Sequence, residues 1–386
     1  MKKVRLVIII LALGLFCLPP GALGDWSAAK RLTWTSGNSL SPALTTDSAG
    51  NIHVVWSDDT PGNPEVYYKK STDAGATWGT AKRLTWNSGA SGGQVIAADS
   101  SNAIHVVWLD NTPGNFEVYY KRSTDAGLTW SAAQRLTWTP ALDQYSAIAI
   151  DSSDTVHVAW EDDTATNEYE IFYKKSTDGG ASWSPNKRLT WTISSGSYEP
   201  AMAPDSGNGV YIAWEDAYAG NWEIYCRDST DGGTTWSATK RVTLTSGSSY
   251  SPAIALDSSD AVHIAWYDDT PGNYEVHFAR STDAGATWSA TQRLTWNSGI
   301  SAEPQTAVDS SNVIHVVWYD DTSGDNEVYH KRSTDGGATW SSATRLTWNS
   351  GTSQYQTIAI DAGGAVHVVW QDSTPFNWEI YYKKGT

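Results

Sequence analysis

Three observations predict an all-β chain built from seven copies of one small unit. The tetrapeptide Arg-Leu-Thr-Trp recurs at intervals of 52 or 53 residues. Each interval holds short β-branched and aromatic runs separated by Gly, Pro, Asn and Asp, as in antiparallel β-structure. No segment after residue 24 has a helical period. The copies begin at Arg31, Arg83, Arg135, Arg188, Arg293 and Arg345, with an altered copy, Arg-Val-Thr-Leu, at Arg241.

The second unit shows which strands each copy contributes. A short apolar run over residues 94–99 predicts the first strand, and the run over 104–108 predicts the second. Residues 117–122 predict the third strand, which a Ser-Thr-Asp turn separates from a fourth strand over 134–138. Each unit therefore supplies four strands, and its apolar faces must be buried against neighbouring units.

The numbers of copies predict that the units close into a ring. The second and third strands each occur seven times, whereas the complete Ser-Thr-Asp turn occurs six times. Residues 25–34 contain the tail of such a turn and a fourth strand, so they complete the last unit. Closure of this kind hides the strand edge that an open array would expose. We therefore predict a seven-bladed β-propeller over residues 25–386, with four antiparallel strands per blade and the ring closed by the N-terminal strand.

The turns between third and fourth strands carry a recognisable motif. Residues 71–78 read Ser-Thr-Asp-Ala-Gly-Ala-Thr-Trp and residues 333–340 read Ser-Thr-Asp-Gly-Gly-Ala-Thr-Trp. Five of the six turns match Ser-x-Asp-x-Gly-x-Thr-Trp, and the sixth has Ser182 in place of Thr. These turns resemble the Asp-box, or BNR, repeat of the sialidase superfamily. The resemblance implies the propeller fold and turns that lie away from the active face, but it does not imply an activity.

The N-terminal residues and the composition predict an exported protein. Residues 1–24 combine three cations, an apolar run over 6–18 and a small-residue exit, as in a secretory signal peptide. Its removal would take three cations and change the net charge from −16 to −19, so we expect no nucleic-acid partner. No second apolar stretch predicts a membrane span. We expect a secreted or periplasmic monomer in which Cys226 is a small buried hydrophobe.

The 22 tryptophans fall into sets that follow the repeat. One set ends the second strands and another closes the Asp-box turns, and we expect both to fill the space between blades. The Trp of each Arg-Leu-Thr-Trp copy would lie near one face, where packing in the core is the favoured interpretation. Two tryptophans, Trp222 and Trp378, belong to no set.

The candidate ligand-binding residues lie where the copies differ. The residue before each third strand is aromatic in five of seven copies, and the loops before the first strands add four tyrosines. By strand direction both groups of loops lie on one face. Rings flanked by Asp and Asn suit stacking on sugars, although the rings could equally cap the blade ends. The candidates are Phe116, Tyr145, Tyr169, Tyr198, Trp222, Tyr250, Tyr274, Tyr355 and Trp378.

Several features argue against catalysis and bound cofactors. The innermost strands contain no arginine, whereas the resemblance implies three converging arginines in a sialidase. The candidate acids recur in nearly every blade, but Glu199 and Glu303 are unusual inner-strand acids that a hydrolase could use. Repeated histidines are expected to form structural hydrogen bonds. We expect no cofactor and no metal, although Ca²⁺ at the Asp-Asp-Thr-Pro-Gly-Asn loops stays open.

The sequence thus predicts a secreted, non-catalytic binding module whose partner is a glycan or an extracellular protein. Glycan binding through the loop aromatics is the favoured function. The alternatives are a sialidase-like glycoside hydrolase with a non-standard carboxylate pair and a platform for protein–protein interaction.

Overall fold

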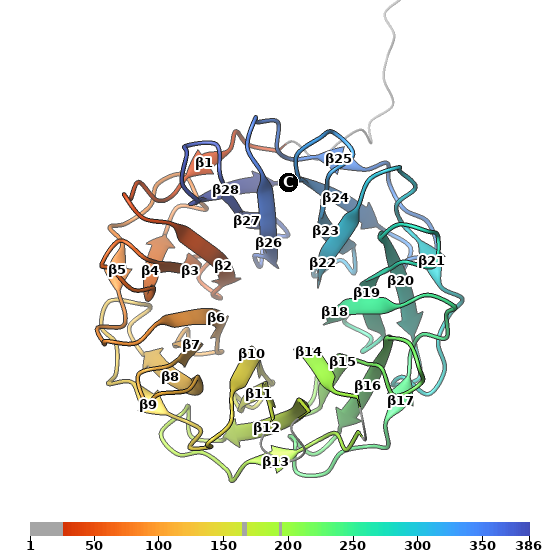
Figure 1. Cartoon of the computed structure of the whole chain (residues 1–386), viewed down its shortest axis with the longest axis horizontal. Helices are drawn as coiled ribbons and strands as arrows, with labels where there is room; N and C mark the ends of the chain where they lie inside the picture. Colours follow the sequence, from red (N-terminus) through yellow and green to blue (C-terminus); the bar gives the residue numbers. More distant parts are fainter. Residues whose placement is uncertain (1–25, 164–167, 193–194) are drawn as a thin grey trace, which may run out of the picture.

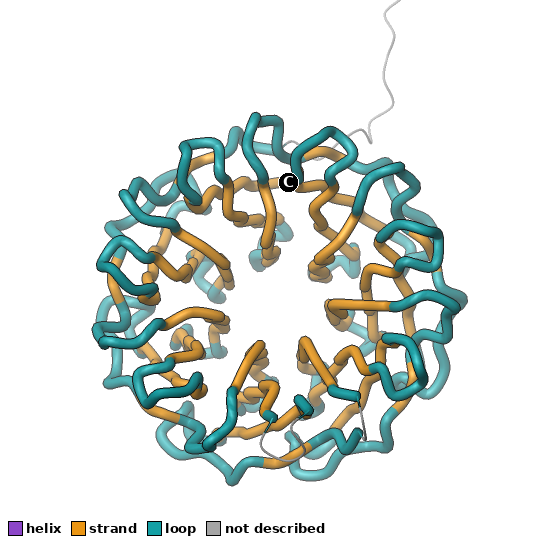
Figure 2. Tube along the Cα trace, viewed as in Figure 1, coloured by secondary structure: helices purple, strands orange, loops and turns teal. Residues whose placement is uncertain are grey.

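Seven four-stranded antiparallel sheets surround a central axis (Figure 1), as the sequence predicts. The computed structural model describes residues 26–163, 168–192 and 195–386, so the predicted signal peptide lies outside the described residues. Within these ranges every regular element is a β-strand, and loops join the strands at both faces and the rim (Figure 2).

Each blade runs outward from an innermost strand. The innermost strands are β2 (Ser39–Thr46), β6 (Ser91–Ala98), β10 (Asp143–Ile150), β14 (Ser197–Pro204), β18 (Ser249–Leu256), β22 (Ser301–Val308) and β26 (Ser353–Ile360). The second strands are β3 (Ile52–Asp58), β7 (Ile104–Asp110), β11 (Val156–Asp162), β15 (Val210–Asp216), β19 (Val262–Asp268), β23 (Ile314–Asp320) and β27 (Val366–Asp372).

The outer half of each blade contains a long third strand and a short fourth one. The third strands are β4 (Glu65–Ser71), β8 (Glu117–Ser123), β12 (Glu170–Ser176), β16 (Glu223–Ser229), β20 (Glu275–Ser281), β24 (Glu327–Ser333) and β28 (Glu379–Gly385). The fourth strands are β5 (Lys82–Arg83), β9 (Gln134–Arg135), β13 (Lys187–Arg188), β17 (Lys240–Arg241), β21 (Gln292–Arg293), β25 (Thr344–Arg345) and β1 (Lys30–Arg31).

The N-terminal strand closes the ring, as predicted. In β1, Lys30 pairs with Tyr382 and Arg31 with Tyr381 of β28, so the first and last strands share a blade. The fourth strands are shorter than predicted. Beyond the arginine of β5 a threonine side chain takes the place of a backbone acceptor for β4: the Val66 N–H donates to Thr85 Oγ1 at 2.9 Å.

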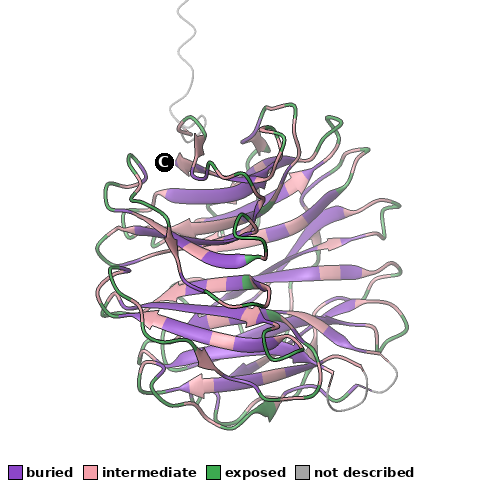
Figure 3. Cartoon of the chain, turned by 60° about the vertical axis from the view of Figure 1, so that its left-hand side comes forward, coloured by how far each residue is buried: buried purple, intermediate pink, exposed green. Residues whose placement is uncertain are grey.

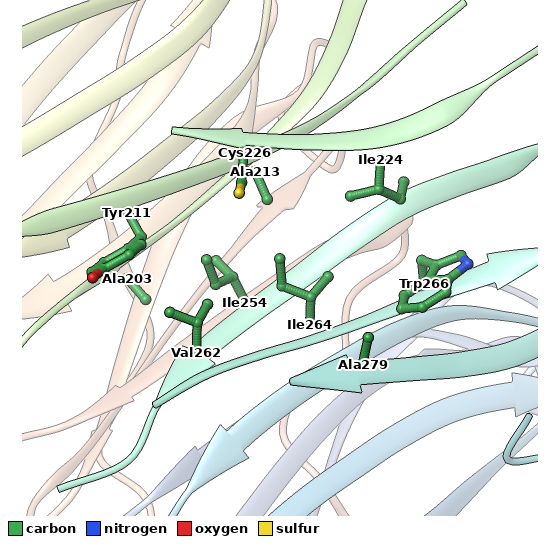
Figure 4. Close-up of a cluster of buried hydrophobic side chains, with 10 residues drawn as sticks. All are labelled: Ala203, Tyr211, Ala213, Ile224, Cys226, Ile254, Val262, Ile264, Trp266 and Ala279. Atoms are coloured by element: carbon green, nitrogen blue, oxygen red, sulfur yellow. The ribbon is translucent and has the colours of Figure 1, made fainter. Parts of the chain in front are cut away.

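The core lies between adjacent blades. The tryptophan of each second strand is at most 1% exposed, which confirms its predicted structural role. Figure 3 shows the buried residues running along the strands and the exposed ones gathered in the loops. Between blades 4 and 5, Trp266, Ile224 and Ile264 pack together (Figure 4). Cys226 is buried in the same cluster, as predicted.

The Asp-box turns are held by their own side chains. Asp73 Oδ1 accepts the Thr77 N–H at 2.7 Å and Asp73 Oδ2 accepts the Thr77 hydroxyl at 2.6 Å. Gly75 has φ +81°, and its Cα faces the Tyr382 ring of the preceding blade so closely that a Cβ would overlap it. Glycine is therefore required there for both its conformation and its size.

The repeated histidines are structural, as expected. His53 Nδ1 is 2.7 Å from Tyr68 Oη, and His53 Nε2 is 3.0 Å from Asp47 Oδ2. Burial lowers the pKa of His53, so the ring is neutral at pH 7 and serves as a fixed hydrogen-bonding link. Equivalent links to aspartate form at His105, His157, His263 and His367.

The tryptophans of the Arg-Leu-Thr-Trp copies correct one expectation, because they are not in the core. Their exposed fractions are 63–73%. In this short segment the leucine is buried and the threonine points inward, so the tryptophan faces outward. Trp34 lies between two cations, with the Arg31 guanidinium 5.7 Å and Lys69 Nζ 5.5 Å from its ring centroid. Arg31 also pairs with Glu379 at 2.7 Å, an arrangement repeated in all seven blades.

Candidate functional site

Two groups of loops lie together on one face of the ring, as strand direction predicts. Asp59 Oδ1, after the second strand of blade 1, accepts the Asn38 N–H before the first strand at 2.6 Å. Asp269 and Asp321 accept the equivalent N–H groups of blades 5 and 6. These recurrent aspartates therefore hold the loops in place, and the residues between them are free to differ.

Five of the predicted binding residues form one continuous arc of rings across blades 3, 4 and 5. Their centroids are separated by 5.5 Å for Tyr169–Tyr198, 5.3 Å for Tyr198–Trp222, 6.1 Å for Trp222–Tyr250 and 5.9 Å for Tyr250–Tyr274. Each ring is partly exposed. We call these five residues the aromatic arc. Two edge-to-face contacts and two tilted ones fix the rings relative to one another, so the arc is a preformed apolar surface.

A central cavity of about 890 Å³ lies beside the arc. Phe116, Tyr145 and Tyr355 line it, and the two tyrosines are 55% and 50% exposed. Gln144 joins the two regions, because it lines the cavity and its Nε2 donates to Tyr169 Oη at 2.7 Å. Trp378 is a partly buried residue of blade 7 that belongs neither to the arc nor to the residues lining the cavity.

A β-bulge in every innermost strand directs one residue into the cavity. In β2 the pairing with β3 shifts between Leu40 and Ala43, and Ser41 has φ 50°. All seven equivalent residues have φ between 39° and 59°, and all seven line the cavity. We call them the bulge ring. Its members are Ser41, Gly93, Tyr145, Glu199, Ser251, Glu303 and Tyr355.

In three blades the residue after the second-strand tryptophan accepts a hydrogen bond from the bulge of the next blade. Gln371 Oε1 accepts the Ser41 N–H at 2.8 Å. Glu161 Oε1 accepts the Glu199 N–H at 2.5 Å, and Glu215 Oε2 accepts the Ser251 N–H at 2.6 Å. The same backbone contact is thus made by a neutral amide in one blade and by a carboxyl group in two others.

The acids of this site have raised pKa values because they are buried. Burial raises the pKa of Glu161 and of Glu215 to about 8, and that of Glu303 to about 7. Burial likewise raises the pKa of Glu199, whose carboxylate accepts a hydrogen bond from the Ser251 hydroxyl. Nearby carboxylates add to the effect, since Glu199 raises the pKa of Glu303. At neutral pH the cluster holds protons that free carboxyl groups would release.

Tyrosines complete the cluster. Burial and the glutamates raise the pKa of Tyr145 and, in the second strand of blade 6, of Tyr319 to about 12. Tyr267, from the second strand of blade 5, also has a raised pKa, and its ring is 5.4 Å from Tyr250 of the arc. A tyrosine nucleophile requires the opposite shift, so these hydroxyls serve as neutral donors.

Some members of the site could not be recognised from the repeat alone. The position after the second-strand tryptophan varies between blades. It holds Glu161, Glu215, Tyr267 and Tyr319 in blades 3 to 6. That variation was the available signal. Phe376 is a second omission: it stands where other blades have a glycine of positive φ, and it has φ 81° and a fully exposed ring.

Within the described ranges, no group of three or more His, Cys, Asp or Glu side chains is placed to hold a metal ion. A search of the same residues for a helix of sufficient length and apolarity to cross a membrane finds none.

Seven four-stranded blades with Ser-x-Asp-x-Gly turns define an Asp-box β-propeller. A family model described as a BNR repeat-like domain matches residues 170–374, more than half of the chain, and the chain belongs to this family. No curated protein sequence matches the chain significantly.

Solved structures with the same fold include a polysaccharide lyase and a sialidase. A PL25 ulvan lyase is 11% identical with a TM-score of 0.67, over 92% of this chain and 95% of that one. A Trypanosoma rangeli sialidase is 13% identical with a TM-score of 0.56, over 93% of this chain and 59% of that one. A Dyadobacter fermentans protein of unknown function is 14% identical with a TM-score of 0.56, over 92% and 98%. At these identities the likeness establishes the fold.

Proposed function

We propose that the chain is an exported, non-catalytic glycan-binding module. The observation that carries the proposal is the aromatic arc, a preformed surface of five rings beside a cavity of about 890 Å³. Partly exposed rings stack on the apolar faces of sugars, and the neighbouring amides, hydroxyls and carboxyl groups can bond to sugar hydroxyls. Glycan-active neighbours of the same fold support the class of ligand.

The acids of the cavity support binding over hydrolysis. A glycosidase needs two carboxyl groups in different environments, one protonated and one ionised. Burial raises the pKa of both Glu199 and Glu303, so the pair lacks this division. The arginines of the seven repeat copies pair with glutamates of the third strands and are not available to clamp a substrate carboxylate.

A glycan array probed with residues 25–386 tests the proposal. Trp222→Ala removes the central ring of the arc, and binding to the selected glycan should weaken at least about tenfold, or about 1.4 kcal/mol. The matched control is Trp296→Leu, because Trp296 is 68% exposed outside the arc and blade 4 carries Leu244 at the equivalent position. Equal binding by wild type and Trp222→Ala would contradict the assignment of the arc.

The hydrolase alternative has its own measurement. The wild-type chain is incubated with a panel of aryl glycosides, and the proposal expects no release of the aryl group. Turnover that Glu199→Gln or Glu303→Gln abolishes would replace the binding module with a hydrolase. Circular dichroism of both variants would show that the ring remains folded.

A further inference from the structure

Six positions of the bulge ring carry a side chain although glycine would adopt the positive φ of the bulge without strain. Blade 2 makes its bulge with Gly93, the residue that adopts positive φ without strain. The other six blades hold a Ser, Glu or Tyr in the left-handed region, which costs about 1 kcal/mol for each residue. A role in shaping the strand does not require those side chains. What they share is that all line the cavity.

The supporting position gives a second internal comparison. Gln371 shows that a neutral amide suffices to accept the N–H of the next bulge, yet Glu161 and Glu215 make the same contact with carboxyl groups. With Glu199 and Glu303 this gathers four acids at one side of the axis, in blades 3 to 6. Among the described residues that line the cavity there is no lysine, arginine or histidine. Buried carboxylates without a counter-charge are unfavourable, so the site lacks a positive partner.

Unpartnered acceptors point in the same direction. Gln94 and Gln356 line the cavity, are 3% and 2% exposed, and have no hydrogen-bond partner at Oε1. Their orientation is fixed, because each Nε2 donates to the carbonyl oxygen of a bulge residue, Ser41 or Glu303. Glu161 Oε2, in a side chain with no exposed surface, also lacks a partner. These oxygens lie within the wall of the cavity, so the wall is rich in acceptors and acids and poor in positive charge.

We propose that the central cavity binds an organic ammonium group, carried by an amino sugar of the glycan. An ammonium has donors and no acceptor, which suits a wall of acids and amide oxygens. It also supplies the missing positive charge and can lie against the faces of Tyr145 and Tyr355. Metal binding is not favoured, because the described acids form no group suited to a metal ion. An acidic sugar would add negative charge beside four glutamates.

This inference rests on the proposed function but can fail separately from it. The probes are a β-1,4-linked glucosamine oligomer with fully trimethylated nitrogens, the N-acetylated oligomer of equal length, and tetramethylammonium alone. Trimethylation keeps the positive charge at every pH but removes the N–H donors. A second cationic oligomer, with free amines, is therefore measured at pH 6, and its affinity relative to the trimethylated one gives the contribution of the donors. Titration calorimetry should give at least about tenfold tighter binding of both cationic oligomers than of the neutral one.

The pH dependence provides a further readout. The titratable groups that line the cavity are Asp143, Tyr145, Glu199, Glu303 and Tyr355. Glu161, Glu215, Tyr267 and Tyr319 lie close enough to Glu199 or Glu303 to be affected by their charge, and Lys174 is the cation nearest Asp143. The tyrosines stay neutral below pH 10. Glu303 ionises as pH rises through about 7, Glu161 and Glu215 through about 8 and Asp143 through about 9, and burial also raises the pKa of Glu199. The affinity for the trimethylated oligomer should therefore rise between pH 5.5 and 8.5, with release of protons.

Charge-neutral variants locate the effect. Glu199→Gln and Glu303→Gln should each weaken the trimethylated oligomer about tenfold and leave the N-acetylated oligomer unchanged. The control is Asp325→Asn, which removes an exposed carboxylate from a loop on the same face. Equal affinity for charged and neutral oligomers would overturn the inference and leave glycan binding standing. Binding of tetramethylammonium without binding of any oligomer would keep the ammonium site and contradict its delivery by an amino sugar. No binding of any probe would overturn the inference, and the glycan array then decides whether glycan binding stands.

Discussion

The two faces of the ring use the same repeat in opposite ways. On the Asp-box face the six complete turns are alike: an aspartate accepts from its own turn, and in five of the six a glycine meets an aromatic ring of the preceding blade. On the cavity face the backbone repeats but the side chains of the bulge ring do not. The comparison teaches that the uniform face stabilises the closed ring, whereas the divergent face carries acids and strained residues that the fold does not need.

The largest expected effect is on the uniform face. Gly75→Ala forces a side chain at φ +81° and a Cβ into the ring of Tyr382. Gly285→Ala is the matched control. Its φ is +76°, but a Cβ there would lie 3.5 Å from Lys240 Cδ and 3.6 Å from Cys226 Sγ, which are ordinary contact distances. Both should lose about 1 kcal/mol of unfolding free energy from the backbone, and Gly75→Ala about 2 kcal/mol more from overpacking. Urea unfolding measures both.

Equal losses in the two glycine variants would mean that the ring of Tyr382 moves aside without cost. The uniform face would then owe its regularity to backbone conformation alone.

The second prediction concerns a blade that departs from its neighbours. Six blades place a serine that donates to the aspartate at the end of the second strand, as Ser39 does to Asp58 at 2.8 Å. Blade 3 has Asp143 instead, and burial, with Asp162 and Glu117 nearby, raises its pKa to about 9. Lys174 is the facing cation and Thr137 donates a hydrogen bond to it.

Asp143→Ser should therefore stabilise the ring in a pH-dependent way. A carboxyl group with a raised folded pKa contributes stability below its unfolded pKa of about 4 and loses it as pH rises through about 9. The gain in unfolding free energy should be near zero at pH 4 and about 2 kcal/mol at pH 8. Ser39→Asp is the reciprocal variant and should introduce the opposite pH dependence in blade 1. A gain independent of pH would exclude the carboxyl group as its cause.

The fold was predictable because it depends on counting. Seven copies of two strands and a split unit require a closed ring, and short β-branched runs define the strands without tertiary information. Core packing of the Arg-Leu-Thr-Trp tryptophans was wrongly predicted. The strand ends at Arg83, so the alternation of a β-strand no longer applies beyond it and the tryptophan faces outward.

The site was predictable only in part. Aromatic divergence in the loops identified the five residues of the arc, since divergence is visible in the sequence. The contact of Glu161 with the next blade was not, because it depends on a β-bulge in that blade, which the sequence does not show. Composition likewise cannot show that the acids of separate blades converge on one axis.

A smaller effect separates the charge of Glu161 from its role as the hydrogen-bond acceptor for the next bulge. Glu161→Gln keeps the acceptor for the Glu199 N–H, as Gln371 does for Ser41, but removes the carboxyl group. The groups facing Glu161 are Glu199, Glu215, Tyr145, Tyr169 and Tyr198. Because the folded pKa of Glu161 is about 8 and its unfolded pKa about 4.5, the wild type loses stability between these values. The variant should be about 1 kcal/mol more stable than the wild type at pH 8.5 and equally stable at pH 4, as measured by urea unfolding.

The control Asp325→Asn should leave the free energy of unfolding unchanged at both pH values. A less stable Glu161→Gln variant at pH 8.5 would show that the carboxylate supports the bulge.

The smallest effect tests whether the bulges are strained. Ser41→Gly removes a side chain at φ 50° whose backbone N–H and carbonyl make the bonds that position the bulge. Relief of the left-handed strain, about 1 kcal/mol, exceeds the entropic cost of glycine, so the variant should gain about 0.5 kcal/mol of unfolding free energy. Gly93→Ala reverses the exchange in the next blade: it introduces the strain and brings a Cβ to 3.0 Å from Leu109 Cδ1, so it should lose about 1 kcal/mol. If Ser41→Gly is the less stable protein while Gly93→Ala is tolerated, the bulge ring is unstrained, and its Glu and Tyr residues need no functional explanation.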